Sequence, residues 1–318
     1  MTVNKAPDQQ IPPCGGSILV ADSGSTKTDW RLLEGGGHTR AFTTSGLNPH
    51  HCDDEELQHR LAPVLEQVDG RNVHRIHFYG SGCTRDQLHR MILLLRKAFR
   101  CQRVEVKSDM VGAARAASPG EPALVAILGT GSNLCYWDGR RITPSVPSLG
   151  YILGDEGSGS HIGRQLLRRL MRGQLPGLNA AFYQQTRLTD AAILDHLYRL
   201  PGTGAWLASL VPFCVEHRRS TTILELLTDC FNQFLDTHSA IIQRHPHTPL
   251  HFIGSIATQF RPEIKRLLLL RGIRIGHFIP SPIEGLEKYH LLKDFNENNP
   301  DDEDDGNDED NDNDESAD

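Results

Sequence analysis

The chain has 318 residues, which is too long for one ordinary hydrophobic core and fits two domains of roughly 100–200 residues each. Hydrophobic residues make up 38% of the sequence and charged residues 23%, a balance typical of a folded globular protein. The net charge of −7 is concentrated at the C-terminus, because residues 301–318 carry twelve acidic side chains and no Lys or Arg. Without those twelve charges the rest of the chain is near +5, and it lacks the clustered basic stripes of a nucleic-acid-binding protein.

The cysteines and the start of the chain indicate the compartment. The seven cysteines are scattered, odd in number and without a C-x-x-C pair, which argues against a disulfide framework and for a reducing environment. The first 16 residues lack the apolar stretch of a signal peptide, and no run approaches the roughly 20 apolar residues of a membrane span. We therefore expect a cytoplasmic protein with no membrane and no nucleic-acid partner.

The first half of the chain has the pattern of three short strands followed by alternating helices and strands. Turn-rich segments separate the three strands, which predicts an antiparallel meander. Asp53 stands where it can cap the following helix, whose apolar residues recur at helical spacing. The expected elements are, in chain order, strands at 17–23, 28–34 and 40–44, a helix at 53–68, a strand at 75–79, a helix at 85–99, a strand at 104–107 and a helix at 110–117.

The second half opens in the same way, with a buried strand that runs into a Gly-rich turn. Its expected elements are strands at 123–128, 134–137 and 141–146, helices between 157 and 244, a strand at 250–253, a helix at 263–270, a strand at 273–278 and a final helix at 282–292. Two units that start alike indicate a duplicated α/β organisation, although no letter-by-letter repeat is present.

This organisation predicts the domain bounds. We expect a flexible N-terminal segment at 1–16, domains at 17–118 and 119–293, and a disordered acidic tail at 294–318. A low-complexity acidic segment buries too little apolar surface to offset the entropy lost on ordering. Whether the tail solubilises the protein or binds a specific partner stays open.

The motif DSGSTKTD at the end of the first strand is the strongest local signal for chemistry. Gly24 allows backbone N–H groups to approach a phosphate, while the hydroxyls of Ser25 and Thr26 and the ammonium of Lys27 add donors. Asp22, at the strand end, can hold a hydrated Mg²⁺. A hairpin rather than a helix follows, so the motif is neither a P-loop nor a dinucleotide fingerprint. Taken alone, it is more often an ordinary polar hairpin turn.

A second Gly-rich turn follows the first strand of the second unit. It reads GTGSN, from Gly129 to Asn133, and its glycines and hydroxyls can cradle a phosphate or form an ordinary hairpin. Two such turns at equivalent places in a duplicated unit point to one nucleotide phosphate chain held between two domains. The coincidence of the two turns carries more weight than either motif.

Asp109 follows the last strand of the first unit and starts a helix. Ser108 and Asp109 there can be an ordinary N-cap. In the functional interpretation Asp109 is a general base, because phosphoryl transfer to an alcohol needs a carboxylate within reach of the hydroxyl. The Gly-rich segment 150–159 can be a hinge or a ligand loop, and the strand that ends at Gly254 and Ser255 can pass under a planar base.

Seven motifs along residues 17–290 resemble one known family. They are, in order, ADSGSTKTDW, SGLNP, SDMVGAARA, LGTGSN, GYILGDEGSGS, FIGSIA and SPIEGL. The chain resembles the BadF/BadG/BcrA/BcrD ATPase family and is most similar to its N-acetylglucosamine kinase-like members. The resemblance implies two ribonuclease-H-like domains of the actin-like ATPase superfamily around a nucleotide cleft. It also implies an ATP- and Mg²⁺-dependent kinase that acts on a small-molecule amino sugar, with N-acetylglucosamine and its 6-phosphate expected first.

The resemblance also assigns roles to individual residues. It makes Asp109 the catalytic base and Asp22 the acid associated with Mg²⁺. The positions expected to bind ATP are Gly24, Ser25, Thr26, Lys27, Thr130, Gly131, Gly254 and Ser255. The positions expected to bind the sugar are Asn48, Ser132, Asn133 and Asp155. The chain departs from the family at Gly80–Cys83, where sugar kinases often carry an acidic residue after the glycines, and it is shortened after Ser281.

Two other functions and one assembly are compatible with the same superfamily. An ATP-driven activator of a dehydratase would need cysteines that hold an iron–sulfur cluster, and no cysteine stands in a recognisable ligand setting. A non-catalytic sugar or nucleotide sensor would be expected to lack the base or the acidic metal ligand, yet Asp22 and Asp109 are both present. A homodimer is left open.

Overall fold

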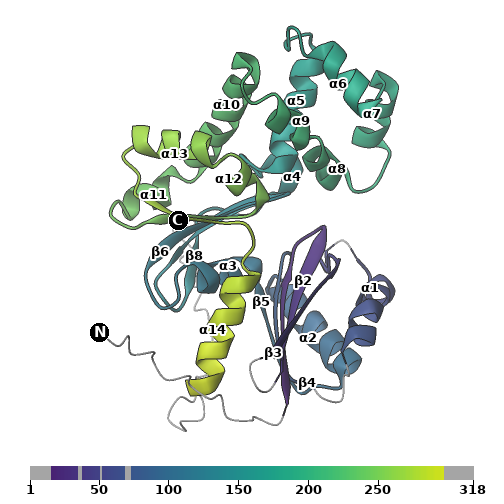
Figure 1. Ribbon diagram of the computed structural model, residues 1–318, viewed down its shortest axis with the longest axis vertical. Coiled ribbons are helices and arrows are strands. Elements are labelled where there is room, and N and C mark those ends of the chain that lie inside the picture. The colour runs from purple at the N-terminus through teal and green to yellow at the C-terminus, as the bar shows by residue number, and fades with distance from the viewer. Residues whose placement is uncertain (1–15, 35–37, 51, 69–72, 297–318) are drawn as a thin grey trace, which may run out of the picture.

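The computed structural model describes residues 16–34, 38–50, 52–68 and 73–296 and shows two lobes, each built on a five-stranded mixed sheet (Figure 1). Most of the expected N-terminal segment and the acidic tail from residue 297 onward lie outside the described residues. None of the helices in the described ranges is both long enough and apolar enough to cross a bilayer.

The first lobe has the predicted element order and the predicted meander. Its elements are β1 (Ser17–Ser23), β2 (Lys27–Glu34), β3 (His38–Ser45), α1 (Asp54–Gln67), β4 (Val73–Gly80), α2 (Arg85–Phe99), β5 (Arg103–Ser108) and α3 (Asp109–Ala117). The sheet order is β3-β2-β1-β4-β5, antiparallel from β1 to β3 and parallel from β1 to β5. Asp53 caps α1 as expected, because its carboxylate accepts a hydrogen bond of 2.9 Å from the Glu56 backbone N–H.

The second lobe repeats this sheet and adds helices. Its elements are β6 (Ala123–Leu128), β7 (Ser132–Trp137), β8 (Ile142–Pro144), α4 (Gly150–Leu153), α5 (Gly159–Met171), α6 (Asn179–Thr186), α7 (Asp190–Tyr198), α8 (Thr203–Ser209), α9 (Val211–Glu216), α10 (Thr221–Thr237), α11 (Ser239–Arg244), β9 (Leu250–Ile253), α12 (Ser255–Gln259), α13 (Arg261–Leu270), β10 (Ile275–Ile279) and α14 (Ile283–Asn296). The sheet order is β10-β9-β6-β7-β8, so the meander and the two parallel strands recur in the same arrangement. The predicted α/β class and the duplicated organisation are confirmed by the two matching sheets.

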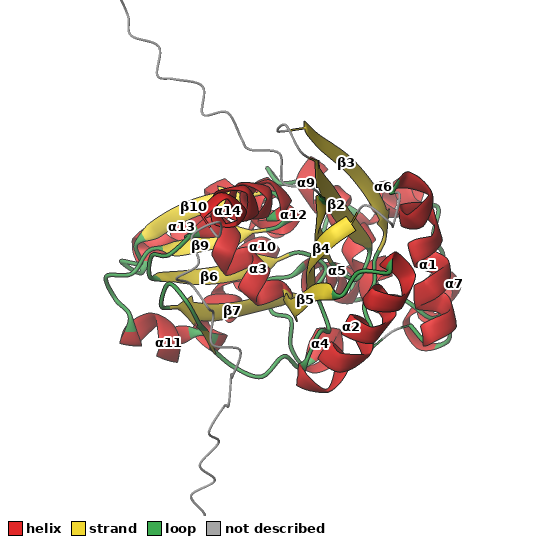
Figure 2. Cartoon of the chain, turned by 90° about the horizontal axis from the view of Figure 1, so that it is seen from below, coloured by secondary structure: helices red, strands yellow, loops and turns green. Residues whose placement is uncertain are grey.

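Helix α3 lies between the two sheets. Its buried residues Met110, Ala113 and Ala114 pack in one cluster with side chains of β6, β7 and β9 from the second lobe. The same helix also contacts β1, β4 and β5 of its own lobe. Figure 2 shows α3 beside α14 between the two sheets. The first residue of α3 therefore lies at the junction of the lobes.

Helix α14 leaves the second lobe and packs on the first (Figure 1). Ile283 and Leu286 are buried in a cluster with Val20 and Leu33 of the first sheet. Gly285 permits close contact with α3, because a Cβ there would lie 2.7 Å from the Ala116 side chain. The domain bounds at 118/119 and at 293 stay a prediction, and the final helix of the second segment forms part of the packing of the first lobe.

Candidate active site

The two Gly-rich turns face each other across the lobes. The turn between β1 and β2 brings Thr26 to the turn between β6 and β7, where the hydroxyls of Thr26 and Thr130 are 3.5 Å apart. These residues are 104 positions apart in the sequence, so the contact arises from the arrangement of the lobes. The two Gly-rich turns therefore face each other, as they must if one nucleotide phosphate chain is to be held between them.

The first turn is held rigidly at its base and exposed at its tip. Gly24 N–H donates to the Lys27 carbonyl at 2.9 Å, and Gly46 N–H donates to the Thr26 carbonyl at 3.1 Å. Gly46 also has to be glycine, because a Cβ there would overlap the carbonyl of Gly24. Below the turn, the buried hydroxyls of Ser23 and Thr28 are 2.8 Å apart. Residues 25–27, at the tip of the turn, are exposed.

The second turn is supported by the start of α5. The backbone N–H of Gly159 donates to the Gly129 carbonyl at 2.8 Å, and that of Ser160 donates to the Thr130 carbonyl at 3.1 Å. Gly254 adjoins the same turn with φ of 114°, a conformation that favours glycine, and a Cβ there would overlap a β6 carbonyl. The structure thus places Gly254 and the following Ser255 next to the second turn.

Two carboxyl groups come from strand ends of the first lobe. Asp22, half-buried at the end of β1, has its pKa raised to about 8 by burial first and by the charges of Asp109 and Asp29 next. Within the described ranges, no hydrogen bond reaches the Asp22 carboxylate. Asp109 opens α3 and accepts a hydrogen bond of 2.9 Å from the Met110 N–H, and burial raises its pKa to about 6. The Ser108 side chain makes no capping bond.

The residues expected to bind the sugar form two groups. In the second lobe, Asp155 adopts a φ of 57°, and its carboxylate accepts a hydrogen bond of 3.2 Å from the Ser132 backbone N–H. Ser132 donates its hydroxyl to the Glu156 carbonyl at 2.7 Å, while Asn133 accepts from the Leu134 N–H at 2.8 Å. Burial raises the pKa of Asp155.

Asn48 belongs to the first lobe and is buried beside Gly82. Its side-chain oxygen accepts a hydrogen bond of 2.9 Å from the His50 N–H, and a Cβ at Gly82 would overlap that oxygen. Within the described ranges, no hydrogen bond joins Asn48 to the group around Asp155. The two groups therefore belong to different lobes.

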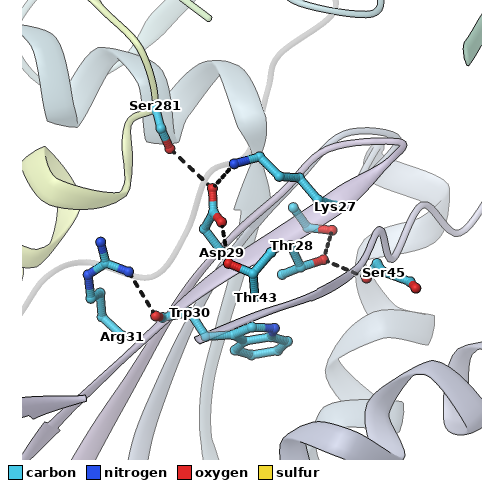
Figure 3. Close-up of polar contacts among 9 residues, drawn as sticks. Lys27, Thr28, Asp29, Trp30, Arg31, Thr43, Ser45 and Ser281 are labelled. Carbon is cyan, nitrogen blue, oxygen red and sulfur yellow. Dashed lines mark hydrogen bonds and ion pairs between the residues drawn. The ribbon is translucent and has the colours of Figure 1, made fainter. Parts of the chain in front are cut away.

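The sequence reasoning missed Asp29, which stands directly opposite Asp22 in the β1–β2 ladder. Its carboxylate accepts hydrogen bonds from Lys27 at 2.6 Å, from Thr43 at 2.8 Å and from Ser281 at 3.4 Å (Figure 3). The antiparallel register of the meander could have suggested the pairing with Asp22. Nothing local to β2 indicated Ser281, which lies 252 residues away.

The described cysteines are poorly suited to hold a metal cluster. Six of them are free and buried, and burial raises the pKa of Cys83, Cys135 and Cys214 to about 12. In the described residues these buried cysteines do not gather into the group of several thiolates that an iron–sulfur cluster requires. This chemistry does not favour the dehydratase-activator alternative.

The repeated sheets and the two facing turns define the class of actin-like ATPase-fold carbohydrate kinases. A Porphyromonas gingivalis protein provisionally named N-acetylglucosamine kinase has 40% sequence identity to this chain. The match covers 87% of this chain and 99% of that one, with a TM-score of 0.83. The chain belongs to this N-acetylglucosamine kinase-like family of ATP-dependent carbohydrate kinases, which confirms the resemblance found in the motifs.

More distant structures share the fold. A Chromobacterium violaceum protein with the same provisional name is 16% identical, with a TM-score of 0.68 over 86% of this chain and 98% of that one. A ROK family glucokinase from Streptomyces griseus, in complex with glucose and AMPPNP, is 13% identical, with a TM-score of 0.55 over 87% of this chain and 99% of that one. No family model matches the chain, and a search of curated proteins finds no relative.

Proposed function

We propose that this protein transfers the γ-phosphate of ATP to a hydroxyl of an amino sugar, with N-acetylglucosamine and its 6-phosphate as the first substrate and product to test. The observation that carries the proposal is the contact of the two turns at Thr26 and Thr130, with Asp22 and Asp109 supplied by the same lobe junction. The similarity to the Porphyromonas gingivalis protein supports the choice of sugar.

The phosphate chain of ATP is assigned to the space between the turns. Gly24 to Lys27 offer backbone N–H groups, hydroxyls and one ammonium from the first lobe, and Thr130 and Gly131 offer a hydroxyl and backbone from the second. Donors on both sides neutralise charge on the transferring group without covalent chemistry. Gly254 and Ser255, next to the second turn, are assigned to the adenosine.

Asp22 fits the role of the acid that holds Mg²⁺. Within the described ranges its carboxylate has no hydrogen-bonded partner, and protein sites usually bind Mg²⁺ through one or two carboxylates together with substrate phosphates. No group of three or more potential metal ligands occurs in the described residues, which agrees with this mode of binding. Asp22 would hold a Mg²⁺ ion beside the first turn, and the ion would supply positive charge to the phosphate oxygens.

Asp109 is assigned as the general base. Its carboxylate takes the proton of the sugar hydroxyl, the sugar oxygen forms a bond to the γ-phosphorus, and the bond to the β–γ bridging oxygen breaks to release ADP. A pKa near 6 leaves most of the Asp109 population ionised at pH 7 while keeping it basic enough to accept the proton. Asn48, Ser132, Asn133 and Asp155 are assigned to the sugar hydroxyls and the acetamido group.

The experiment that tests the proposal is a phosphorylation assay with Mg-ATP and a panel of sugars. We expect a phosphorylated product with N-acetylglucosamine, at O6, and weaker turnover with glucose, which lacks the acetamido group. The Asp109→Asn variant should form the product on the order of 10²–10⁴-fold more slowly. ADP release that does not depend on sugar and gives no phosphorylated sugar would overturn the proposal. A cytoplasmic location and a homodimer stay predictions, to be checked by fractionation and by light scattering.

A further inference from the structure

Asp29 is a nearly buried carboxylate with 8% of its surface exposed, and it sits at the phosphate turn without a role in the reaction described above. We propose that Asp29 is a positioning residue: it holds the ammonium of Lys27 in place for the phosphate chain and ties it to the connection between the lobes. This inference rests on the proposed function, because it assigns Lys27 to the phosphates.

Three structural elements donate to this one side chain (Figure 3). Lys27, at the start of β2, donates to Oδ2 at 2.6 Å; Thr43, on β3, donates to Oδ1 at 2.8 Å. Ser281 lies in the crossover from β10 to α14 and reaches Oδ2 at 3.4 Å. A buried carboxylate is stable only when its oxygens are paired in this way. The hydrogen bond from Thr43 holds the Asp29 carboxylate in one orientation. Its oxygen Oδ2 therefore offers Lys27 an acceptor at a fixed position.

The side chains of Lys27 and Asp29 differ in solvent exposure, and this difference indicates the role of their ion pair. The Lys27 side chain is 61% exposed, whereas that of Asp29 is 11% exposed. An ion pair with one exposed partner adds little to folding stability, because solvent screens it and the long lysine side chain loses rotamer freedom. Its main effect is therefore on where the ammonium is, since an untethered lysine on a four-carbon stem samples many positions.

The position in question is the proposed phosphate site. Lys27 follows Thr26, whose hydroxyl meets Thr130 of the other lobe. Asp29 is the ladder partner of Asp22, and the charges of Asp29 and Lys27 both act on the Asp22 carboxyl, in opposite directions. Removing Asp29 would thus release the lysine at the point where the phosphates, the Asp22 carboxylate and the second lobe meet.

Ser281 connects this cluster to the relative position of the lobes. The crossover that contains it leads from β10 of the second lobe into α14, which packs on the first sheet. Arg31 and Glu287 form a second link between β2 and α14, at 3.1 Å. Asp29 Oδ2 accepts hydrogen bonds from both Ser281 and Lys27. A shift of the crossover segment would therefore move this oxygen, and with it the Lys27 ammonium.

The decisive experiment is a double-mutant cycle with Asp29→Asn, Lys27→Met and the combined variant. The KM for Mg-ATP, the kcat and the melting temperature are measured for each. We expect either single change to raise the KM for Mg-ATP about tenfold, and the combined variant to be no worse than Lys27→Met alone. Asp29→Glu, which keeps the charge, should recover part of the loss, and Ser281→Ala should give a smaller rise in the same direction.

Several outcomes would overturn the inference. Additive effects on the KM would show that Asp29 acts independently of Lys27. A lower KM in Asp29→Asn would show that Asp29 withholds the lysine from the phosphates, and an effect confined to the Mg²⁺ requirement would make it a metal ligand. A lower melting temperature with no change in the KM would make the role purely structural. Asp195→Asn is the control: it removes an exposed 2.9 Å ion pair between Asp195 on α7 and Arg199, and it should leave the KM unchanged.

The cycle also separates this inference from the proposed function. If the wild-type protein phosphorylates no sugar, the proposed function fails. The same four proteins can then be compared by calorimetric titration with Mg-ATP alone, where coupling between Asp29 and Lys27 is still expected as a non-additive loss of affinity. Turnover by the wild type together with additive losses would instead refute only the role of Asp29.

Discussion

The pH dependence of turnover should report the ionisation of Asp109. Burial at the start of α3 raises its pKa to about 6, and a general base works only when it is ionised. The ionised fraction is about 0.9 at pH 7 and about 0.09 at pH 5, so kcat/KM should fall about tenfold between these values and about tenfold per unit below them. The rate is measured from pH 4.5 to 8 with the preferred sugar and at saturating Mg²⁺, because a bound Mg²⁺ would keep the Asp22 carboxylate, whose pKa burial raises to about 8, ionised across this range.

The variant Asp109→Asn provides the control for this profile. It removes the base without changing the side-chain size and should lower the plateau by a factor on the order of 10²–10⁴. The residual activity should no longer change with a midpoint near pH 6. If the acid limb survives unchanged in Asp109→Asn, another group produces it, and the assignment of Asp109 as the base is wrong.

Three further predictions concern stability. Gly254→Ala should lower the free energy of unfolding by about 1–3 kcal/mol, because the φ of 114° is unfavourable for alanine and the new Cβ overlaps a β6 carbonyl. Gly285→Ala should cost about 1–3 kcal/mol, because its Cβ would lie 2.7 Å from a side chain of α3. His290→Phe should weaken the pH dependence of stability. Burial holds the pKa of His290 far below its ordinary 6.5. As the pH falls below about 6.5, the histidine of the unfolded chain takes up a proton while that of the folded chain stays neutral. The free energy of unfolding of the wild type therefore decreases by up to about 1.4 kcal/mol for each pH unit.

Urea denaturation measures all three changes. Gly272→Ala is a reference for Gly254→Ala, because Gly272 also has a positive φ, of 66°, but no atom within 4 Å of where its Cβ would lie. It reports the cost of a positive φ in the left-handed region without the overlap. Equal losses at the two sites would refute the role of the carbonyl contact. An unchanged stability in Gly285→Ala would contradict close packing of α14 on α3, and an unchanged pH slope in His290→Phe would contradict the buried neutral histidine.

Most elements could be predicted from local patterns. The expected bounds of β6, α2 and β9 match those of the structure, since apolar runs and turn residues specify where such elements begin and end. Two strands illustrate how the ends can differ. Strand β10 begins at Ile275, two residues later than expected, because the Ile273 N–H donates to the Leu268 carbonyl to terminate α13. Strand β8 begins at Ile142, because the Asp138 side chain accepts from the Arg141 N–H in the preceding turn.

The Gly-rich segment between β8 and α5 differs from its local pattern. Its glycines predict a hinge or a ligand loop, and the structure contains the short helix α4 at Gly150–Leu153 within it. Two backbone carbonyls of that segment accept hydrogen bonds from Arg164 on α5. A short helix stabilised from a neighbouring helix leaves little trace in its own residues, because four residues carry no periodicity.

The amino-acid sequence by itself determined the strands, the hairpin turns and the duplicated order, because these depend on residues close together along the chain. It also placed Asp22, Lys27 and Asp109 at strand ends, where side chains can reach a ligand. Only the tertiary structure decided that Thr26 meets Thr130, that Ser281 reaches Asp29, and that α14 returns to the first lobe. Such contacts join residues a hundred or more positions apart, and their formation depends on how complementary surfaces pack, which local sequence patterns do not express.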